Sequence, residues 1–186
     1  MSGIGHNNGP TLEGGSGWRR YAWRRARREL LPQLPIEVVR LRIRRAKELG
    51  IDYKSYASIR AANGRDIVAL LFSSNALRVG PRVVTIPEGR AQTLAEIKRC
   101  GRLAMLHAPV NVSEFNRLNG VIDAAERAPD LRDSWGKVRA KVHALTASRG
   151  LPGDGVVVIG DTALEAEWAE AGRLGGFLPS EAIFGP

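Results

Sequence analysis

The first third of the chain carries apolar residues at helical spacing. One predicted helix has an apolar residue at every fourth position: Trp18, Ala22, Ala26 and Leu30. A stripe with steps of three and four residues predicts a second helix: Ile36, Val39, Ile43, Ala46 and Leu49. Pro32 and Pro35 separate the two helices, and Gly50 ends the second. Asp52 is a suitable N-cap for a third helix over residues 53–62, which Asn63 and Gly64 end, so this region is predicted to be helical throughout.

Beyond residue 65, short apolar runs predict strands. The run at 67–72 is continuous, and the turn-forming residues on both sides of it favour a buried strand over a buried helix. Residues 82–86 form a second β-rich segment, and residues 156–160 form the clearest strand. Helical spacing or capping residues predict four helices, at about 93–104, 113–127, 135–150 and 163–171, with Thr93 and Ser113 as the caps of the first two. The pattern therefore predicts an α/β fold, with a helical, arginine-rich N-terminal part followed by a small sheet flanked by helices.

Most of the positive charge lies in one stretch. The chain has 186 residues and a formal net charge of +9. Eleven basic and three acidic residues lie between Trp18 and Gly50, a net charge of +8 that leaves +1 for the rest. Residues 1–17 hold six glycines and few apolar residues, which predicts a flexible arm. We therefore divide the chain into this arm, a basic helical region at 18–65 and an α/β body at 66–186.

Several protein classes are disfavoured by the composition. A lone cysteine, Cys100, excludes an intramolecular disulfide and a multi-cysteine zinc site, and we interpret it as a buried structural thiol. The start lacks the pattern of a secretory signal, and the longest strong apolar run, 67–72, is too short to span a membrane. These features predict a cytoplasmic protein. The GHNNGP opening resembles that of uncharacterised bacterial and phage-borne proteins, which implies no activity.

The arginine-rich helices predict a surface that binds polyanions. Guanidinium groups bind phosphates in a bidentate manner and stack on bases, and acidic residues on the same helices are too few to pair with them. The residues predicted to contact phosphates are Arg19, Arg20, Arg24, Arg25, Arg27, Arg28, Arg40 and Arg44. Trp18 and Trp23 are interpreted as core residues. DNA or RNA is the expected partner, and an anionic membrane surface or an acidic protein partner is the alternative.

A more specific pattern lies within this region. Ala46, Gly50, Ile51 and Ile59 have a spacing that resembles the helix-turn-helix of bacterial DNA-binding domains. The resemblance implies that the second helix enters the major groove, with the following residues facing DNA: Asp52, Tyr53, Lys54, Ser55, Ser58 and Arg60. Tyr56 departs from the pattern, because a smaller aliphatic residue usually stands at this position.

A second resemblance lies near the C-terminus. The segment VVVIGDTALE at 156–165 resembles the last motif of haloacid dehalogenase-like hydrolases. The resemblance implies that Asp161 and Glu165 help to hold Mg²⁺ beside a phosphoryl group. It also implies that Ser73 or Ser74 binds phosphate and that Lys98 serves as the lysine of that family. The chain lacks the Asp-x-Asp sequence that carries the nucleophile of that family, since the acid nearest to the first strand, Asp66, precedes the strand.

The same segment has a structural interpretation. Thr162 and Glu165 have the spacing of a capping box, in which each side chain binds a backbone amide of the other residue. His107 and His143 stand at no spacing that suits a nucleophile and an acid, so both are interpreted as structural or surface residues.

Three function classes follow. We expect a nucleic-acid-binding or regulatory protein without a catalytic residue or a cofactor. The alternative is a Mg²⁺-dependent phosphohydrolase, or a degenerate relative that binds phosphorylated ligands. A module that docks on an acidic protein partner is the third class.

Overall fold

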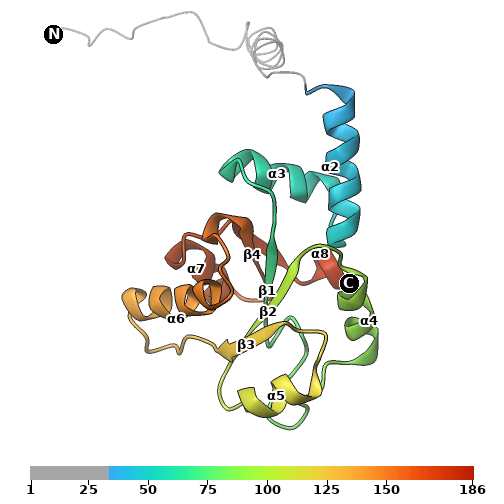
Figure 1. Ribbon diagram of the computed structural model, residues 1–186. Coiled ribbons are helices and arrows are strands. Elements are labelled where there is room, and N and C mark those ends of the chain that lie inside the picture. The colour runs from blue at the N-terminus through green and yellow to red at the C-terminus, as the bar shows by residue number, and fades with distance from the viewer. Residues whose placement is uncertain (1–33) are drawn as a thin grey trace, which may run out of the picture. The chain divides into compact units, whose positions relative to one another are not determined.

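The computed structural model describes residues 34–186 (Figure 1). The first predicted helix and the arginines at positions 19–28 lie outside the described residues. The chain divides into two compact units, Met1–Val39 and Arg40–Pro186. The second unit contains the sheet and is the unit described below.

The centre of this unit is a parallel five-stranded sheet. Its strands follow the order β3-β2-β1-β4-β5, and every neighbouring pair is parallel. The strands are β1 (Ala69–Ser73), β2 (Gly101–Leu106), β3 (Ala124–Arg127), β4 (Val156–Gly160) and β5 (Gly176–Pro179). Strands β1 and β4 are buried at every residue, which explains why both are continuous apolar runs in the sequence. The predicted α/β class is confirmed.

Helices cover both faces of the sheet (Figure 1). Their bounds are α2 (Ile36–Leu49), α3 (Tyr53–Asn63), α4 (Glu88–Glu96), α5 (Val112–Leu118), α6 (Trp135–Ser148), α7 (Ala163–Ala171) and α8 (Glu181–Phe184), with a short 3₁₀ turn at Gly153–Gly155. Phe72 and Ile159 point to the face covered by α2, α3, α4, α5 and α8. Leu71 and Val158 point to the face covered by α6 and α7. The alternation of side chains along each strand therefore supplies two separate cores.

The predicted helix boundaries around residue 50 are confirmed. Gly50 has a φ of +72°, in the left-handed region that favours glycine, and it ends α2. The Asp52 carboxylate accepts a hydrogen bond of 3.0 Å from the Ser55 amide and so caps α3. Gly64, also at a φ of +72°, ends α3 before the chain enters β1. Short-range chemistry alone determines these turns.

The strand predicted at 82–86 is wrong. This segment is an irregular loop between β1 and α4. The Asn119 side chain accepts a hydrogen bond of 2.8 Å from the Ile86 amide and donates one of 3.0 Å to the Val84 carbonyl. One buried amide side chain thus provides the hydrogen bonds that a neighbouring strand would otherwise supply.

The helix predicted at 93–104 is also wrong in its bounds. Helix α4 begins at Glu88, and residues from Gly101 onward form β2. Thr93 lies inside α4 and donates to the Gly89 carbonyl at 3.0 Å, so it is not a cap. The four residues 103–106 are buried between the two cores, and this burial selects the strand.

The helix predicted at 113–127 is in fact two elements. Asn111, rather than Ser113, caps α5 by accepting from the Glu114 amide at 3.0 Å. Helix α5 ends at Leu118, and residues Ala124–Arg127 form the edge strand β3. The polar residues of this strand conceal it in the sequence, because an edge strand needs less apolar surface than a central one.

Predictions near the C-terminus are confirmed. Helix α6 matches the segment predicted at 135–150, and α7 matches the segment at 163–171. The tail packs back on the body as strand β5 and helix α8, where Leu178 and Ile183 are buried.

Candidate functional site

The exposed face of α2 carries basic side chains. Arg40, Arg44 and Lys47 are exposed, and they form no ion pair or side-chain hydrogen bond within residues 34–186. Of the stripe predicted to face the core, Ala46 and Leu49 are buried. Ile36 and Ile43 are exposed, so that part of the prediction is wrong. From Arg40 to Gly50, the helix therefore presents arginine and lysine beside apolar side chains.

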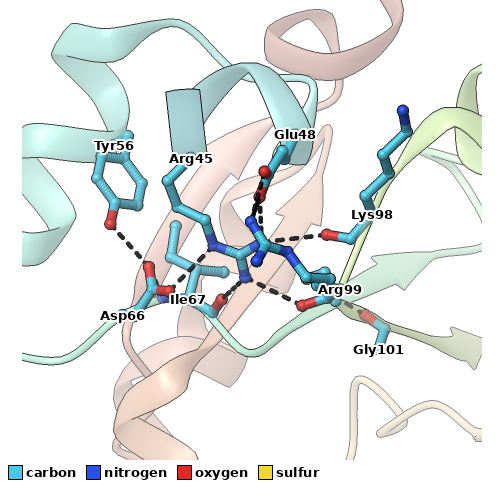
Figure 2. Close-up of polar contacts among 9 residues, drawn as sticks. Arg45, Glu48, Tyr56, Asp66, Ile67, Lys98, Arg99 and Gly101 are labelled. Atoms are coloured by element: carbon cyan, nitrogen blue, oxygen red, sulfur yellow. Dashed lines mark hydrogen bonds and ion pairs between the residues drawn. The ribbon is translucent and has the colours of Figure 1, made fainter. Parts of the chain in front are cut away.

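Arg45 differs from its neighbours because its guanidinium group points into the fold (Figure 2). Its Nε donates to Asp66 at 3.0 Å, and its Nη2 donates to the Ile67 and Arg99 carbonyls at 2.8 and 3.0 Å. Its Nη1 donates to Glu48 at 3.2 Å and to the Lys98 carbonyl at 3.1 Å. The five N–H groups of the guanidinium thus each have an acceptor, and they join α2 to the segments that lead into β1 and β2. Arg45 is a structural residue, a role that the sequence did not indicate.

Three acidic residues of this region are bound by hydrogen bonds within the protein, whereas Glu37 in the first turn of α2 is exposed and has no such bond among residues 34–186. Glu48 accepts from both Arg45 and Arg99, and the Arg99 hydrogen bond is the main reason that the pKa of the Glu48 carboxyl is lowered. Asp66 accepts from Arg45 and, at 2.7 Å, from the Tyr56 hydroxyl. Hydrogen bonds from Ser55 lower the pKa of Asp52. None of these carboxylates therefore pairs with the exposed cations of α2.

The residues of the helix-turn-helix pattern lie partly inside and partly outside the core. Ala46, Ile51 and Ile59 are buried together, with the same core residues that cover the sheet. Tyr56 is also buried, and its hydroxyl bond to Asp66 explains why a tyrosine stands at this position. These contacts suit any pair of helices packed on a sheet, so the reading of DNA by this motif stays a prediction.

The residues predicted to contact DNA on α3 differ in exposure. Lys54 and Ser58 are exposed, whereas Tyr53, Ser55 and Arg60 are half-buried. Asp52 is exposed, but its carboxylate is occupied as the cap of α3. Lys54 and Ser58 are four residues apart and therefore share a face of the helix.

A second group of polar residues lies at the carboxyl ends of the central strands. Ser74 and Asn75 follow β1, His107 follows β2, and Asp161 and Thr162 follow β4. Strands β1 and β4 are neighbours in the sheet, but α4, which follows β1, and α7, which follows β4, cover opposite faces. The two connections therefore leave the sheet in opposite directions at this point. Parallel α/β sheets bind ligands at such a point.

Ser74 and His107 are bound to each other. The Ser74 hydroxyl lies 2.7 Å from His107 Nδ1 and accepts a hydrogen bond of 3.2 Å from the His107 amide. These two contacts hold the imidazole ring through Nδ1, with the donor of the Ser74–Nδ1 bond set by the ring tautomer. Ser74 is buried, so this pair orients the imidazole and does not present a serine nucleophile to solvent.

Glu165 is fully buried and closes the start of α7. One carboxylate oxygen accepts from the Asp161 and Thr162 amides at 2.6 and 3.0 Å, and the Thr162 hydroxyl accepts from the Glu165 amide at 3.3 Å. The other oxygen accepts from Asn75 at 2.8 Å and lies 3.8 Å from His107 Nε2. The predicted capping box is confirmed. The Asp161 carboxylate lies 3.8 Å from the Arg78 guanidinium, and Mg²⁺ binding by Asp161 and Glu165 stays a prediction.

Ser73 and Lys98, which the hydrolase resemblance also implies, are not positioned to bind a phosphoryl group beside Asp161. Ser73 is buried, and its hydroxyl accepts from the Ala76 amide at 3.0 Å. Lys98 precedes β2, and its carbonyl binds Arg45 at the amino end of the sheet. It is therefore not brought together with Asp161, which follows a strand at the carboxyl end.

A cleft of about 350 Å³ opens beside His107 at this end of the sheet. It is lined by Asn75, His107, Ala108, Ala128, Pro129, Asp130, Leu131, Asp133, Val138, Thr162, Leu164, Glu167 and Trp168. The His107 and Trp168 rings are 5.4 Å apart. From the sequence, His107 is interpreted only as a structural or surface residue, since no local motif connects it with residues 130 and 167.

Cys100 lies in an environment that disfavours its thiolate form. Burial raises the pKa of its thiol to about 12, an effect that Arg45 and Arg102 offset only in part. Its environment therefore suits a structural thiol.

Comparisons with known proteins identify no family. No family model and no curated protein matches the chain. One solved structure, an uncharacterized protein from Corynebacterium glutamicum ATCC 13032 Kitasato, is similar at 17% identity and a TM-score of 0.42, over 61% of this chain and 82% of that chain. That likeness is too low to carry a functional argument. Within residues 34–186, no helix is both long and apolar enough to cross a membrane.

Proposed function

We propose that this protein binds nucleic acid through the basic side chains of α2 and α3 and the arginines that precede them in the sequence. The excess of positive charge is confined to one part of the chain. Residues 1–65 contain 14 basic and 5 acidic residues, and residues 66–186 contain 14 of each. A polyanion would therefore be attracted to the first part and not to the body.

The observation that carries the proposal is that acidic side chains near the exposed cations of α2 are hydrogen-bonded within the protein. Glu48, Asp52 and Asp66 are held by internal hydrogen bonds and form no ion pair with Arg40, Arg44 or Lys47. Arg40 and Arg44 on α2 are exposed and have no acidic partner among the described residues. Arginine side chains in this state bind phosphate oxygens without first breaking an internal ion pair.

A salt titration tests the proposal. Each phosphate neutralised on duplex DNA contributes a slope of about −0.9 to the plot of log affinity against log salt concentration. Replacing Arg40 and Arg44 together by glutamine is therefore expected to reduce the slope by about 1.8 while leaving the fold intact. A matched control removes two charges from the body, Arg139 and Arg149, which are also exposed.

The measurement is fluorescence anisotropy with a duplex DNA and with a single-stranded RNA, each over a range of salt. The control variant should keep the wild-type slope. Absence of binding to both probes at low salt would refute the proposal, as would an equal loss of slope in both double variants. The probe that binds with higher affinity, DNA or RNA, shows which nucleic acid the protein prefers.

A second function is proposed for the carboxyl end of the sheet, where a phosphorylated ligand or phosphoester would bind with Mg²⁺. It is supported by the arrangement of β1 and β4, which brings Ser74, Asn75 and Asp161 to the same end of neighbouring strands. The test is hydrolysis of a generic phosphoester with Mg²⁺. Activity that Asp161→Ala abolishes would support the hydrolase, whereas a change only in thermal stability would leave Asp161 as part of the helix cap.

A further inference from the structure

Two arginines come together at the carboxyl end of the sheet. Arg78 lies in the turn that follows β1, and Arg90 lies in the first turn of α4, the next helix along the chain. Arg90 Nη1 donates a hydrogen bond to the carbonyl of Ala76, two residues before Arg78. Arg78 Nη1 lies 3.8 Å from the carboxylate of Asp161, which directly follows β4. These contacts bring both arginines to the ends of the neighbouring strands β1 and β4.

Most N–H groups of the Arg90 guanidinium have no acceptor within residues 34–186, since only Nη1 is bound, to Ala76. The guanidinium lies over the Phe184 ring, 4.3 Å from its centroid, so α8 covers one of its faces. In the described part of the chain, Arg102 Nε is the only side-chain nitrogen that is both unpaired and fully enclosed. The Nε and Nη2 atoms of Arg90 are therefore open to solvent, and their N–H groups are able to donate to a ligand.

The charges around Arg90 are not balanced. Burial lowers the pKa of the Arg90 guanidinium, the nearby Arg78 lowers it further, and Asp161 offsets these effects only in part. A guanidinium keeps its proton throughout the physiological range, so the lowered pKa indicates a positive charge that its surroundings do not stabilise. The Arg78 side chain is 61% exposed, and its distance of 3.8 Å from Asp161 is beyond hydrogen-bond range. One carboxylate thus stands beside two guanidinium groups, and a bound anion would relieve their repulsion.

Hydrogen bonds fix the turn that carries Arg78. The Arg78 amide donates to the Asn75 carbonyl, and the Val79 amide donates to the Ser74 carbonyl, both at 3.0 Å. The Asn75 side chain is itself held by the buried Glu165 carboxylate at 2.8 Å. Arg78 has a φ of +56°, in the left-handed region that few residues other than glycine adopt, and these bonds hold it there. A ligand that binds Arg78 therefore does not have to order the backbone, which lowers the entropic cost of binding.

We propose that Arg78 and Arg90 bind a phosphate-type oxyanion, with both guanidinium groups donating hydrogen bonds to its oxygens. Arginine suits this role because its planar N–H groups match phosphate oxygens in a bidentate manner. The positive charge comes from the protein itself, so binding does not require Mg²⁺. The inference deepens the second function proposed above by naming the residues that hold the phosphoryl group, and it rests on that function only for hydrolysis of the ligand. It is independent of nucleic-acid binding by α2 and α3.

Isothermal titration calorimetry of the full-length protein, without Mg²⁺ and at low salt, tests the proposal. The probes are inorganic phosphate and phenyl phosphate, a phosphomonoester. Arg78→Gln is expected to weaken binding about tenfold, the effect of losing one charged hydrogen bond. This exposed side chain makes no hydrogen bond within residues 34–186, so the variant should fold as the wild type does. Arg90→Lys keeps the charge and loses the planar group, and it should weaken binding as well. The control is Arg139→Gln, which removes an exposed arginine of α6.

Arg139→Gln should bind both probes as the wild type does. Tighter binding of phenyl phosphate identifies a phosphomonoester as the ligand, and tighter binding of inorganic phosphate identifies the free anion. The proposal is overturned if neither probe binds at millimolar concentration, if Arg78→Gln binds as the wild type does, or if Arg139→Gln weakens binding as much as Arg78→Gln.

This inference and the hydrolase proposal fail separately. If Arg78→Gln weakens phosphate binding but the protein does not hydrolyse phenyl phosphate with Mg²⁺, the hydrolase is refuted and the oxyanion site stands. If hydrolysis depends on Asp161 and its KM is unchanged in Arg78→Gln, the hydrolase stands and the assignment of Arg78 and Arg90 is overturned.

Discussion

Arg45→Ala is expected to destabilise the protein strongly, although Arg45 lies in a helix rich in exposed arginines. The substitution removes three hydrogen bonds to backbone carbonyls, those of Ile67, Lys98 and Arg99. At about 1 kcal/mol each, they contribute about 3 kcal/mol to the free energy of unfolding. The ion pair with Asp66 adds less than about 1 kcal/mol, because the Asp66 side chain is 41% exposed.

Urea denaturation followed by circular dichroism measures this change. We expect Arg45→Ala to lose about 3–4 kcal/mol, which corresponds to a decrease of roughly 6–16 °C in the melting temperature of a chain of this size. Arg45→Lys should recover little of the loss, because an ammonium cannot reach five acceptors in different directions. The control is Arg44→Ala, whose exposed side chain has no described partner and whose loss should stay below about 0.5 kcal/mol. The reasoning is refuted if Arg45→Ala costs less than about 1 kcal/mol, or no more than Arg44→Ala.

Three further predictions concern the helix cap, acid stability and the thiol. Thr162→Ala should cost about 1 kcal/mol in urea denaturation and Thr162→Ser much less, because serine keeps the hydroxyl that accepts from the Glu165 amide. Glu48 has a folded-state pKa below its ordinary value, chiefly because Arg99 donates to it, so its contribution to stability is present above the ordinary pKa and is lost as the pH falls through the lowered one. Urea midpoints of wild type and Glu48→Gln should therefore differ near neutral pH and converge in acid; a constant difference would contradict this. Cys100, with a pKa of about 12, should react with a thiol reagent roughly a hundredfold more slowly in the folded protein than in urea, and equal rates would show that the thiol is accessible.

The parts of the fold that the sequence predicted share a physical cause. Strands β1 and β4 lie at the centre of the sheet and are buried on both faces, so their apolar runs are visible without knowledge of their neighbours. Helices α6 and α7 likewise have local signals, an apolar face and a capping box. Strands β2, β3 and β5 were missed because they are bounded by polar residues or are short, and pairing with a neighbour is what makes them strands.

For the candidate sites, too, some features are evident from the sequence and others only from the fold. Net charge is a property of composition, so the basic character of residues 18–65 is evident from the amino acids alone. Which arginines are exposed is not evident from composition, and the fold separates Arg45, whose donors are all bound internally, from Arg40 and Arg44. The cleft could not be predicted at all, since Asn75, His107 and Glu167 have no common motif and meet only at one end of the sheet.

The sequence by itself determined the α/β class, the turns at Gly50 and Gly64, the cap at Thr162 and the location of the positive charge. Each of these depends on residues close together in the chain, where backbone preference, capping and charge act over a few positions. The tertiary structure alone decided the strand order, the inward role of Arg45 and the joining of Ser74, His107 and Glu165. These depend on contacts between residues far apart in the chain, 21 positions for Arg45 and Asp66 and 90 for Asn75 and Glu165, and hydrophobic burial of the whole sheet is what holds such residues together.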